Sequence, residues 1–349
     1  MSAERRRLPA EWEPVGAVLM AWPRANGDWQ PYLGAVRACY RELCAAISRH
    51  APVLLLSTTP QRTAQEFAHL DPGRVRVWGS PAQDTWTRDY GPITVLERQN
   101  NGSESPLLLD FCFNGWGGKY QATGDNQATV AAWRQGVFGA AQLEPVELVL
   151  EGGSIESDGA GTILTTSTCL LSPGRNPQRS QAEIGLALSH QLGAERVIWL
   201  SHGALCGDDT DAHIDTLVRF CNPTTLAYVR CDDPSDPQAG PLTLLEQELR
   251  ELRTAAGLPY RLIPLPWPQA RHAPDDGRRL PATYANFLIL NGAVLVPSYG
   301  DPPCDQAAQQ ALAAAFPCHA IEAIDCSALL LQHGSLHCAT MQIPAAVFR

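Results

Sequence analysis

A thiol near the C-terminus of the 349-residue chain is a candidate nucleophile. In "GSLHCATMQIP", Gly334–Pro344, Cys338 directly follows His337. A thiol attacks as a thiolate, so near neutral pH it needs a base or a positive neighbour. Adjacent side chains of a strand point to opposite faces, so we expect His337 to be a structural neighbour that faces away from Cys338. The alternative is a buried strand in which Cys338 is only a small apolar residue.

A histidine that could serve as the base occurs in "GDDTDAHIDTLVRF", Gly207–Phe220. His213 and Asp215 are two positions apart, and positions i and i+2 of a strand share a face. We therefore expect both side chains to face the same side. A histidine with an aspartate is also a metal-ligand set, but no HExxH motif, second nearby histidine or cysteine pair completes a shell. A solvated acidic turn is the third interpretation.

Two further segments offer carboxylates. "DTWTRDYGPI", Asp84–Ile93, contains two aspartates, two aromatic residues and Arg88. Taken alone, it is equally typical of a surface turn with an Arg88–Asp ion pair. In "LVLEGGSIE", Leu148–Glu156, a hydrophobic strand ends in Glu151 before two glycines. That position suits a carboxylate facing a pocket, although an exposed loop glutamate is the simpler interpretation.

Helical and extended patterns alternate along the chain, which indicates an α/β protein. One helix has its apolar face at Leu33, Val36, Tyr40, Leu43 and Ile47. A second begins with a capping box at Ser180 and Glu183 and stops at Gly193. We expect a third to end at Gly257, and an alanine-rich fourth to be capped by Asp305 and to reach Phe316. Strands are predicted at residues 52–58, 196–200, 225–230, 286–290 and 293–297.

Pattern alone favours a doubly wound parallel sheet for such a chain. No GxGxxG or P-loop motif stands at a strand-to-helix junction, so the sequence predicts no nucleotide. The glycines of "FNGWGGKY", residues 113–120, precede no helical pattern and are typical of a loop near a ligand.

Composition restricts the partners. The formal net charge of −10 argues against a nucleic-acid partner and is compatible with a cationic substrate. No apolar run approaches the ~18 residues that span a membrane. The basic N-terminus is followed by a polar, proline-containing stretch rather than an apolar signal region. We therefore expect a cytoplasmic protein whose eleven scattered cysteines are mostly reduced.

Together, the segments identify a family resemblance that covers essentially the whole chain. The chain resembles the agmatine deiminase and bacterial peptidylarginine deiminase family of guanidine-modifying enzymes. The matching segments, in order, are "LPAEWEP", "VLMAWP", "DTWTRDYGP", "FNGWGGKY", "LEGGSIE", "LLSPGRNP", "DDTDAHID", "YANFLILNGAVLVPSYGD" and "LHCATMQIP". Each segment alone is modest evidence, whereas all of them in this order are highly specific.

The resemblance implies a fold that the pattern does not predict. Family members have the pentein fold, a five-bladed α/β propeller, which here would form a single catalytic domain over residues 1–349. Five repeats in this length would have about 70 residues each, which suits strand–helix units. The active site of such a fold lies on the central axis, where distant segments converge. The family's frequent homo-oligomers make an oligomer possible here.

The resemblance also assigns roles in hydrolysis of a guanidinium to a ureido group and ammonia. Asp89 and Asp215 match the carboxylates that hold the guanidinium by charge-assisted hydrogen bonds. Cys338 matches the nucleophile that forms a covalent amidino-thioether. His213 matches the acid and base, and Glu151 matches the carboxylate that orients it. Neither a metal nor an organic cofactor is implied.

Agmatine carries a distal ammonium, which would need a carboxylate of its own. Asp209 and Asp84 are the candidates, with Trp116 or Trp86 as an aromatic wall or cation–π partner. Asn286 matches an asparagine beside the site.

Free arginine would instead need a cation for its α-carboxylate. Arg88 and Arg219 are the candidates for this cation, and we expect Arg219 to form a structural pair.

Three departures from the agmatine-specific pattern bear on the substrate. His333-Gly334-Ser335 replaces a glycine run, Ala212 replaces a glycine before the histidine, and Met341 replaces a glutamine. The Ala212 change is costly only if its φ is positive.

The preferred prediction is hydrolysis of agmatine to N-carbamoylputrescine and ammonia, a step toward polyamines. The alternatives are deimination of peptidyl-arginine, amidino transfer to an amine, and a scaffold that binds agmatine without turnover.

Overall fold

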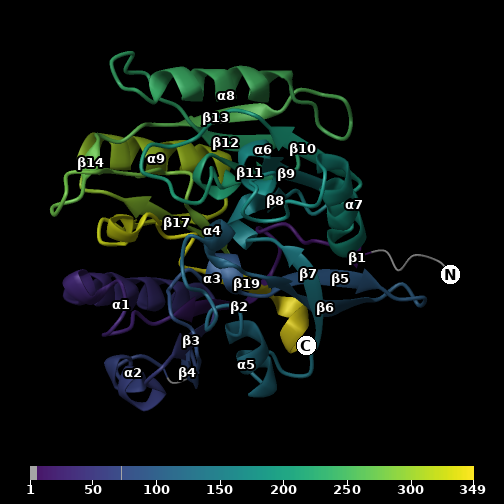
Figure 1. Ribbon diagram of the computed structural model, residues 1–349, viewed down its shortest axis with the longest axis vertical. Helices are drawn as coiled ribbons and strands as arrows, with labels where there is room; N and C mark the ends of the chain where they lie inside the picture. The colour runs from purple at the N-terminus through teal and green to yellow at the C-terminus, as the bar shows by residue number, and fades with distance from the viewer. Residues whose placement is uncertain (1–5, 72) are drawn as a thin grey trace.

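Short strands form several small sheets in the computed structural model, which describes residues 6–71 and 73–349 (Figure 1). The fold is mixed α/β. One sheet has the order β19–β2–β3–β4, with bounds Met341–Pro344, Val15–Ala21, Val53–Ser57 and Val75–Gly79. A second has the order β1–β5–β6–β7, with bounds Arg6–Arg7, Ile93–Arg98, Glu104–Cys112 and Gln142–Val149.

The other sheets of the described residues are smaller. The strand order β10–β9–β8 comprises Arg196–Leu200, Thr162–Thr166 and Ile155–Ser157. The order β11–β12–β13 comprises Val218–Asn222, Thr225–Val229 and Arg261–Leu265. The order β16–β17–β18 comprises Leu288–Leu290, Ala293–Ser298 and Ala320–Asp325. A two-stranded ribbon pairs β14 and β15, Arg271–His272 and Arg279–Leu280.

Each of the described sheets with three or four strands, which we call the larger sheets, combines an antiparallel pair with a neighbouring parallel pair. The antiparallel pairs are β19·β2, β5·β6, β8·β9, β11·β12 and β16·β17. The parallel pairs include β2·β3, β6·β7, β9·β10, β12·β13 and β17·β18. The expectation of one doubly wound parallel sheet is therefore wrong. Local periodicity predicts where strands occur, but it carries no information on which strands pair or in which direction.

Parallel neighbours need a crossover, and helices supply it. The crossover helices are α1 (Leu33–His50), α2 (Pro60–Glu66), α5 (Ala128–Arg134), α7 (Gln181–Leu192), α8 (Ala239–Glu251) and α9 (Pro302–Ala315). Three one-turn helices are α3 (Thr87–Tyr90), α4 (Gly115–Gly118) and α6 (Ser167–Leu170). Figure 1 shows α3 and α4 toward the middle of the molecule, with the sheets arranged around them.

Most predicted elements are confirmed, and two helix ends differ. The capping box of α7 is present, and Gly193 ends that helix with φ +70°. Helix α8 ends at Glu251 rather than at Gly257, because Leu252 already has an extended backbone. Asp301, not Asp305, caps α9. Asp305 instead accepts hydrogen bonds from the Tyr284 hydroxyl and from backbone amides.

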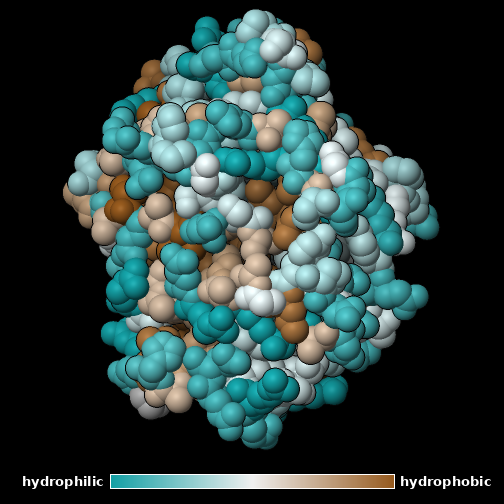
Figure 2. All heavy atoms as spheres, turned by 90° about the vertical axis from the view of Figure 1, so that its left-hand side faces the viewer, coloured by the Kyte–Doolittle hydropathy of each residue, from teal (hydrophilic) through white to brown (hydrophobic). Residues whose placement is uncertain are grey.

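Buried apolar side chains from all the larger sheets and from α1, α7, α8 and α9 form one continuous core. The expected face of α1 is confirmed, since Val36, Tyr40, Leu43 and Ile47 are fully buried. Trp22 is buried, and Trp12 packs against this core. Figure 2 shows mostly hydrophilic residues on the face beside α1 and β14, with hydrophobic groups gathered toward its middle. No helix of the described part of the chain is long and apolar enough to cross a membrane.

Candidate active site

Five segments that lie far apart in the sequence meet at one buried centre. They are α3, the turn at Gly152–Ser154, the 3-10 turn at Ile214–Thr216, the residues before β16, and the turn that precedes β19. Gly153 shows how close they come, because a Cβ placed there would lie 2.7 Å from His213 Nδ1 and 2.8 Å from Asp89 Oδ1. It would also lie 3.2 Å from Asp215 Oδ2. Two carboxylates and an imidazole therefore surround one small space, which we call the guanidinium space.

The two carboxylates of this space are held differently. Asp89 Oδ2 accepts a hydrogen bond from Trp116 Nε1 at 2.9 Å, and its Oδ1 accepts one from the amide of Gly153 at 3.0 Å. Burial raises the pKa of Asp89 to about 6, although the charge of His213 opposes the increase. In Asp215, Oδ2 contacts the side chains of Asn286 and His337, while the buried Oδ1 has no hydrogen-bond partner within residues 6–71 and 73–349.

The pKa of Asp215 is lowered despite its burial. Burial alone would raise it, but a hydrogen bond and the charge of His337 outweigh that effect. A carboxylate that stays ionised and keeps one oxygen free is suited to bind a cation.

His213 lies between two carboxylates rather than on a strand. It directly precedes the 3-10 turn Ile214–Thr216, so the predicted strand geometry is wrong, although both His213 and Asp215 are fully buried at the centre. Its Nδ1 lies 3.6 Å from Asp89 Oδ1, and its Nε2 lies 4.0 Å from Glu151 Oε2. Neither ring nitrogen has a hydrogen-bond partner by distance and angle. Burial alone would lower the pKa of His213, but Asp89, Cys169 and Glu151 raise it well above its usual range.

Glu151 is fixed by an arginine that the sequence did not single out. Arg175 Nε lies 3.0 and 2.9 Å from the two carboxylate oxygens of Glu151, and both side chains are fully buried. The other end of Arg175 binds Asp211 at 2.6 Å and the carbonyl of Thr210 at 2.8 Å. Arg175 belongs to the segment "LLSPGRNP". The family resemblance of this segment is the sequence feature that could have identified Arg175 as a site residue.

The nucleophile candidate lies against an amide and a carboxylate. Cys338 Sγ lies 3.2 Å from Asn286 Nδ2 and 3.6 Å from Asp215 Oδ2. The Asn286 side chain also accepts hydrogen bonds from the backbone amides of His337 and Cys338. Burial, together with the charges of Asp215 and Asp89, raises the pKa of the Cys338 thiol well above its usual range. The thiol therefore carries its proton until a cation neutralises the two carboxylates.

This protonated state predicts slow alkylation of Cys338 near pH 7. In peptide mapping after iodoacetamide treatment, we expect Cys338 to react far more slowly than the exposed Cys206. Because the thiol pKa is raised, its rate should keep increasing with pH above 9. Equal rates for the two cysteines at pH 7 would contradict this state of the thiol.

His337 differs most from its prediction. The residues around it form a turn rather than a strand, so the rule that adjacent side chains alternate between faces does not apply. Its Nδ1 lies 2.7 Å from Asp215 Oδ2, and its Nε2 lies 2.8 Å from Glu11 Oε2. The ring is therefore bonded to a carboxylate of the guanidinium space. Neither this contact nor the contribution of Glu11 could be inferred from the sequence.

A narrow cavity of about 20 Å³, the front cavity, leads outward from Cys338. Trp86, Trp116, Asp84 and Asp209 line it, as do Asp28 and Tyr120, which were not singled out in the sequence. Burial and the charges of Asp125 and Asp28 raise the pKa of Asp84 to about 7, although hydrogen bonds from Thr85 oppose the increase.

A left-handed backbone at Trp116, φ +55°, places its indole beside Asp89. The glycines around it also have positive φ. The glycine-rich segment therefore forms a tight loop at the ligand side, as its composition indicates.

Arg88 and Arg219, the two arginines considered for binding an α-carboxylate, are both buried. Arg88 contacts Gln342, Met341 and the carbonyl of His337, so the interpretation of its segment as a surface turn is wrong. Arg219 pairs with Glu156 and Glu11, which is the structural pairing we expected.

Two of the replaced glycine positions require left-handed backbone. Ala212 has φ +66° and His333 has φ +68°. Alanine at position 212 therefore costs more conformational free energy than the glycine it replaces.

Two groups of side chains have metal-ligand composition, Glu151–Cys169–His213 and Glu11–Glu156–His337. In each, an arginine already binds the carboxylates, Arg175 in the first and Arg219 in the second. A guanidinium thus supplies the positive charge that a metal ion would bring, and these groups do not fit a metal.

Comparison with known proteins adds independent information. Residues 7–344 match the family described as Porphyromonas-type peptidyl-arginine deiminase. The chain is 34% identical to an agmatine deiminase of Stutzerimonas stutzeri, over 98% of this chain and 96% of that protein. It is similar to a C. jejuni agmatine deiminase solved with substrate bound, with TM-score 0.88 and 34% identity over 97% of this chain and 96% of that one. A Porphyromonas gingivalis structure, provisionally described as an arginine deiminase, gives TM-score 0.88 and 44% identity over 97% and 98%.

Proposed function

This chain belongs to the Porphyromonas-type peptidyl-arginine deiminase family, and we propose that it hydrolyses agmatine to N-carbamoylputrescine and ammonia. The reaction would proceed through a covalent amidino-cysteine. The observation that carries the proposal is the guanidinium space itself. It is bounded by the ionised Asp215, by Asp89 and by the high-pKa His213, directly beside the thiol of Cys338.

The first half of the reaction follows from these positions. The guanidinium enters between Asp89 and Asp215 and donates hydrogen bonds to the ionised Asp215 carboxylate, whose Oδ2 borders the guanidinium space. Its charge offsets the carboxylate field that disfavours the thiolate, so Cys338 releases its proton to solvent and the thiolate attacks the central carbon. His213, protonated because of its raised pKa, gives its proton to the departing nitrogen. A carbon–sulfur bond forms, a carbon–nitrogen bond breaks, and ammonia leaves.

The second half consumes one water. His213, now neutral, takes a proton from the water that attacks the amidino carbon. The carbon–sulfur bond breaks, the ureido product departs, and Cys338 leaves as a thiolate that regains its proton. Glu151, held by Arg175, stabilises the protonated imidazole on the side away from the substrate. The balance is one water consumed and one ammonia released, which takes up the proton that Cys338 gave to solvent and becomes ammonium, with no metal or cofactor required.

The front cavity favours agmatine over free arginine. Its walls include the carboxylates of Asp28, Asp84 and Asp209, while its lining among the described residues contains no lysine or arginine. A distal ammonium would be attracted there, whereas the α-carboxylate of free arginine would meet negative charge. Trp86 and Trp116 offer aromatic walls for the intervening methylenes. Asn286 would hold Cys338 and Asp215 in register, since its amide contacts both side chains.

The test is turnover of three substrates given separately: agmatine, arginine and a blocked arginine peptide. We expect ammonia and ureido product chiefly from agmatine. Turnover of the peptide alone would refute agmatine as the substrate and favour peptidyl-arginine. Adding an amine and looking for its amidino derivative distinguishes the transferase alternative.

The raised pKa values of Asp84 and Asp89 predict the acid limb of kcat/KM. Both carboxylates must be ionised to hold the cation, and each is ionised above its pKa. As pH falls, kcat/KM for agmatine should decline first near pH 7, where Asp84 protonates, and again near pH 6, where Asp89 does. In Asp84→Asn, KM should rise roughly tenfold at pH 8 and only the loss near pH 6 should persist.

The control for this pH profile is Asp232→Asn, at an exposed aspartate outside the front cavity. Its profile should match that of the unmodified protein. An unchanged first loss in Asp84→Asn would show that Asp84 does not bind the distal ammonium.

The small sheets support a proposal for the architecture. The repeated combination of an antiparallel pair and a parallel neighbour would make the five larger sheets the blades of a pentein propeller, forming one catalytic domain over residues 1–349. Antiparallel pairing of β19 with β2 joins the two ends of the chain, as a closed ring requires. The cytoplasmic location and a homo-oligomer stay predictions.

A further inference from the structure

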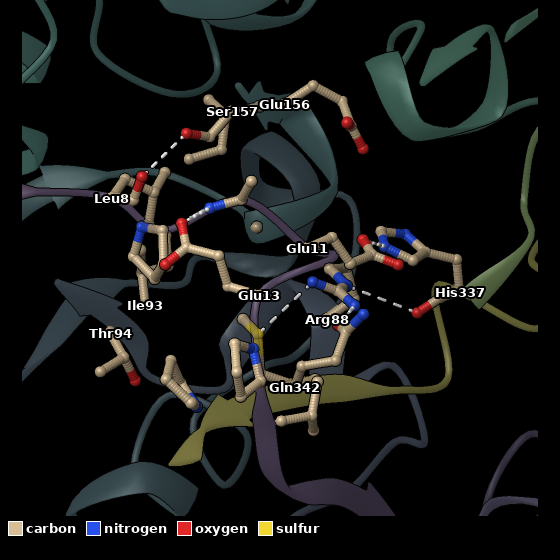
Figure 3. A pocket seen from close by; sticks show the side chains of 18 residues that line it. Leu8, Glu11, Glu13, Arg88, Ile93, Thr94, Glu156, Ser157, His337 and Gln342 are labelled. Carbon is tan, nitrogen blue, oxygen red and sulfur yellow. Dashed lines mark hydrogen bonds and ion pairs between the residues drawn. The ribbon is translucent and has the colours of Figure 1, made fainter. Parts of the chain in front are cut away.

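A second cavity lies behind the guanidinium space. This rear cavity has a volume of about 100 Å³, and its walls include Glu11, Glu13, Arg88, Glu156 and His337 (Figure 3). Pro14, another lining residue, is exposed, so the cavity reaches the surface. Gly152 lines the rear cavity, whereas its neighbour Gly153 borders the guanidinium space. The wall between the two spaces is therefore about one residue thick.

His337 crosses this wall and joins two carboxylates. Its Nδ1 is 2.7 Å from Asp215 Oδ2 on the substrate side, and its Nε2 is 2.8 Å from Glu11 Oε2 on the rear side. The Asn286 side chain accepts a hydrogen bond from the backbone amide of His337 at 2.8 Å. Figure 3 shows the imidazole directed at the carboxylate of Glu11. With both ring nitrogens and the backbone amide bonded, the ring has one orientation.

This arrangement leaves the two oxygens of Asp215 unequal. Oδ2 faces His337 and Asn286, while the buried Oδ1 has no partner among the described residues. Without the imidazole, Asp215 would lose its shortest hydrogen bond, and Glu11 would lose the ring that lies between the two carboxylates. Arg219 binds Glu11 and Glu156, and its Nη2 also lies 3.0 Å from His337 Nε2 on the rear side. Arg88 contacts Gln342. Among the described residues, neither arginine is hydrogen-bonded to Asp215, so neither replaces the imidazole there.

We propose that His337 is a positioning residue, which anchors Oδ2 of Asp215, the oxygen beside the guanidinium space and the Cys338 thiol, so that the carboxylate stays directed at the substrate guanidinium. The proposal rests on the proposed function, because it assigns Asp215 to the guanidinium. Glu11 orients the imidazole from the rear. We therefore expect loss of the His337 contact to lower kcat. Asp89 would still attract the cation, but a rotated Asp215 side chain would displace the reacting carbon from the Cys338 thiol.

A matched pair of variants separates hydrogen bonding from packing. His337→Asn keeps an N–H donor near the place of Nδ1, whereas His337→Leu has nearly the same size without a donor. We expect kcat to fall roughly 10- to 100-fold in His337→Leu and less than tenfold in His337→Asn, as for loss of a hydrogen bond to a charged group. Equal losses in the two variants would overturn the proposal.

Chemical rescue uses the rear cavity. In His337→Ala, the vacated space joins a cavity that reaches the surface, so added imidazole should enter and restore kcat at least tenfold. His50→Ala is the control, because His50 Nε2 makes a similar 2.7 Å contact with Glu322 away from the centre. Its activity should be normal and unaffected by imidazole. Rescue and the Asn–Leu difference support positioning, while absence of rescue in folded His337→Ala overturns it.

Failure of this inference is distinguishable from failure of the proposed function. Turnover by the unmodified protein decides the substrate, and all variants are compared on whichever guanidino substrate it hydrolyses. If His337→Ala does not fold, the Asn–Leu pair decides the outcome. If His337→Leu also fails, Glu11→Gln is compared with the unmodified protein, and an unchanged kcat in that variant overturns the orienting role of Glu11.

Discussion

Replacing Cys338 by alanine is expected to lower kcat for agmatine by roughly 10⁴-fold or more, while agmatine still binds. Among the described residues, Cys338 is the cysteine that lines the front cavity, whereas the fully buried Cys169 does not line it and groups with Glu151 and His213. Binding should survive because Asp89 and Asp215, the two groups proposed to hold the guanidinium, are unchanged. The measurements are steady-state ammonia release and calorimetric titration of the variant with agmatine.

Two variants control for loss of a cysteine as such. Cys206→Ala removes an exposed thiol and should keep full activity. Cys338→Ser keeps a hydroxyl in place but lacks an ionisable thiol, and it should be as inactive as the alanine variant. Full activity of Cys338→Ser would refute the covalent mechanism as a whole.

The second large effect on activity is expected when a single methyl group is added at Gly153. In Gly153→Ala, the added Cβ would lie 2.7 Å from His213 Nδ1, 2.8 Å from Asp89 Oδ1 and 3.2 Å from Asp215 Oδ2. The methyl group would occupy part of the guanidinium space and push its three polar walls apart. Because misplacement of reacting groups by about 1 Å costs roughly 10²-fold, we expect kcat/KM to fall by that factor or more.

Gly34→Ala is the matched control, because an added Cβ at Gly34, within α1, would meet nothing within 4 Å. It should leave activity unchanged and raise stability slightly, since alanine has the higher helix propensity. Thermal unfolding of both variants separates a damaged site from a damaged fold. A Gly153→Ala protein with normal kcat/KM would show that the guanidinium binds elsewhere.

The negative electrostatic potential at the guanidinium space explains why a cation is the expected ligand. Asp89, Asp215 and Glu151 bring three carboxylates around one imidazole, and burial removes the water that would otherwise solvate them. The same field disfavours a thiolate in the free protein. A guanidinium thus fits the site electrostatically and also activates the nucleophile, which makes the reaction depend on the substrate's own charge.

Much of the local structure follows from the sequence. The apolar spacing of α1, the capping box of α7 and the strands at residues 53–57 and 293–298 are set by interactions within a few residues. The segments that meet at the centre were also recognisable, because aspartates, histidine and cysteine beside glycines are residues that a core does not need. The expectations of a common chemistry and of a propeller arrangement came from the family resemblance, since periodicity favoured the wrong sheet.

Only the tertiary structure decided which partners these residues have. The alternation rule placed His337 away from the site, but its turn brings it onto Asp215, 122 positions away in the sequence. The contact of Glu11 with His337, 326 positions away, likewise leaves no trace in local pattern. Residue type and spacing encode which groups a segment can offer, whereas the packing of sheets against one another fixes which oxygen of Asp215 is bonded and which is free.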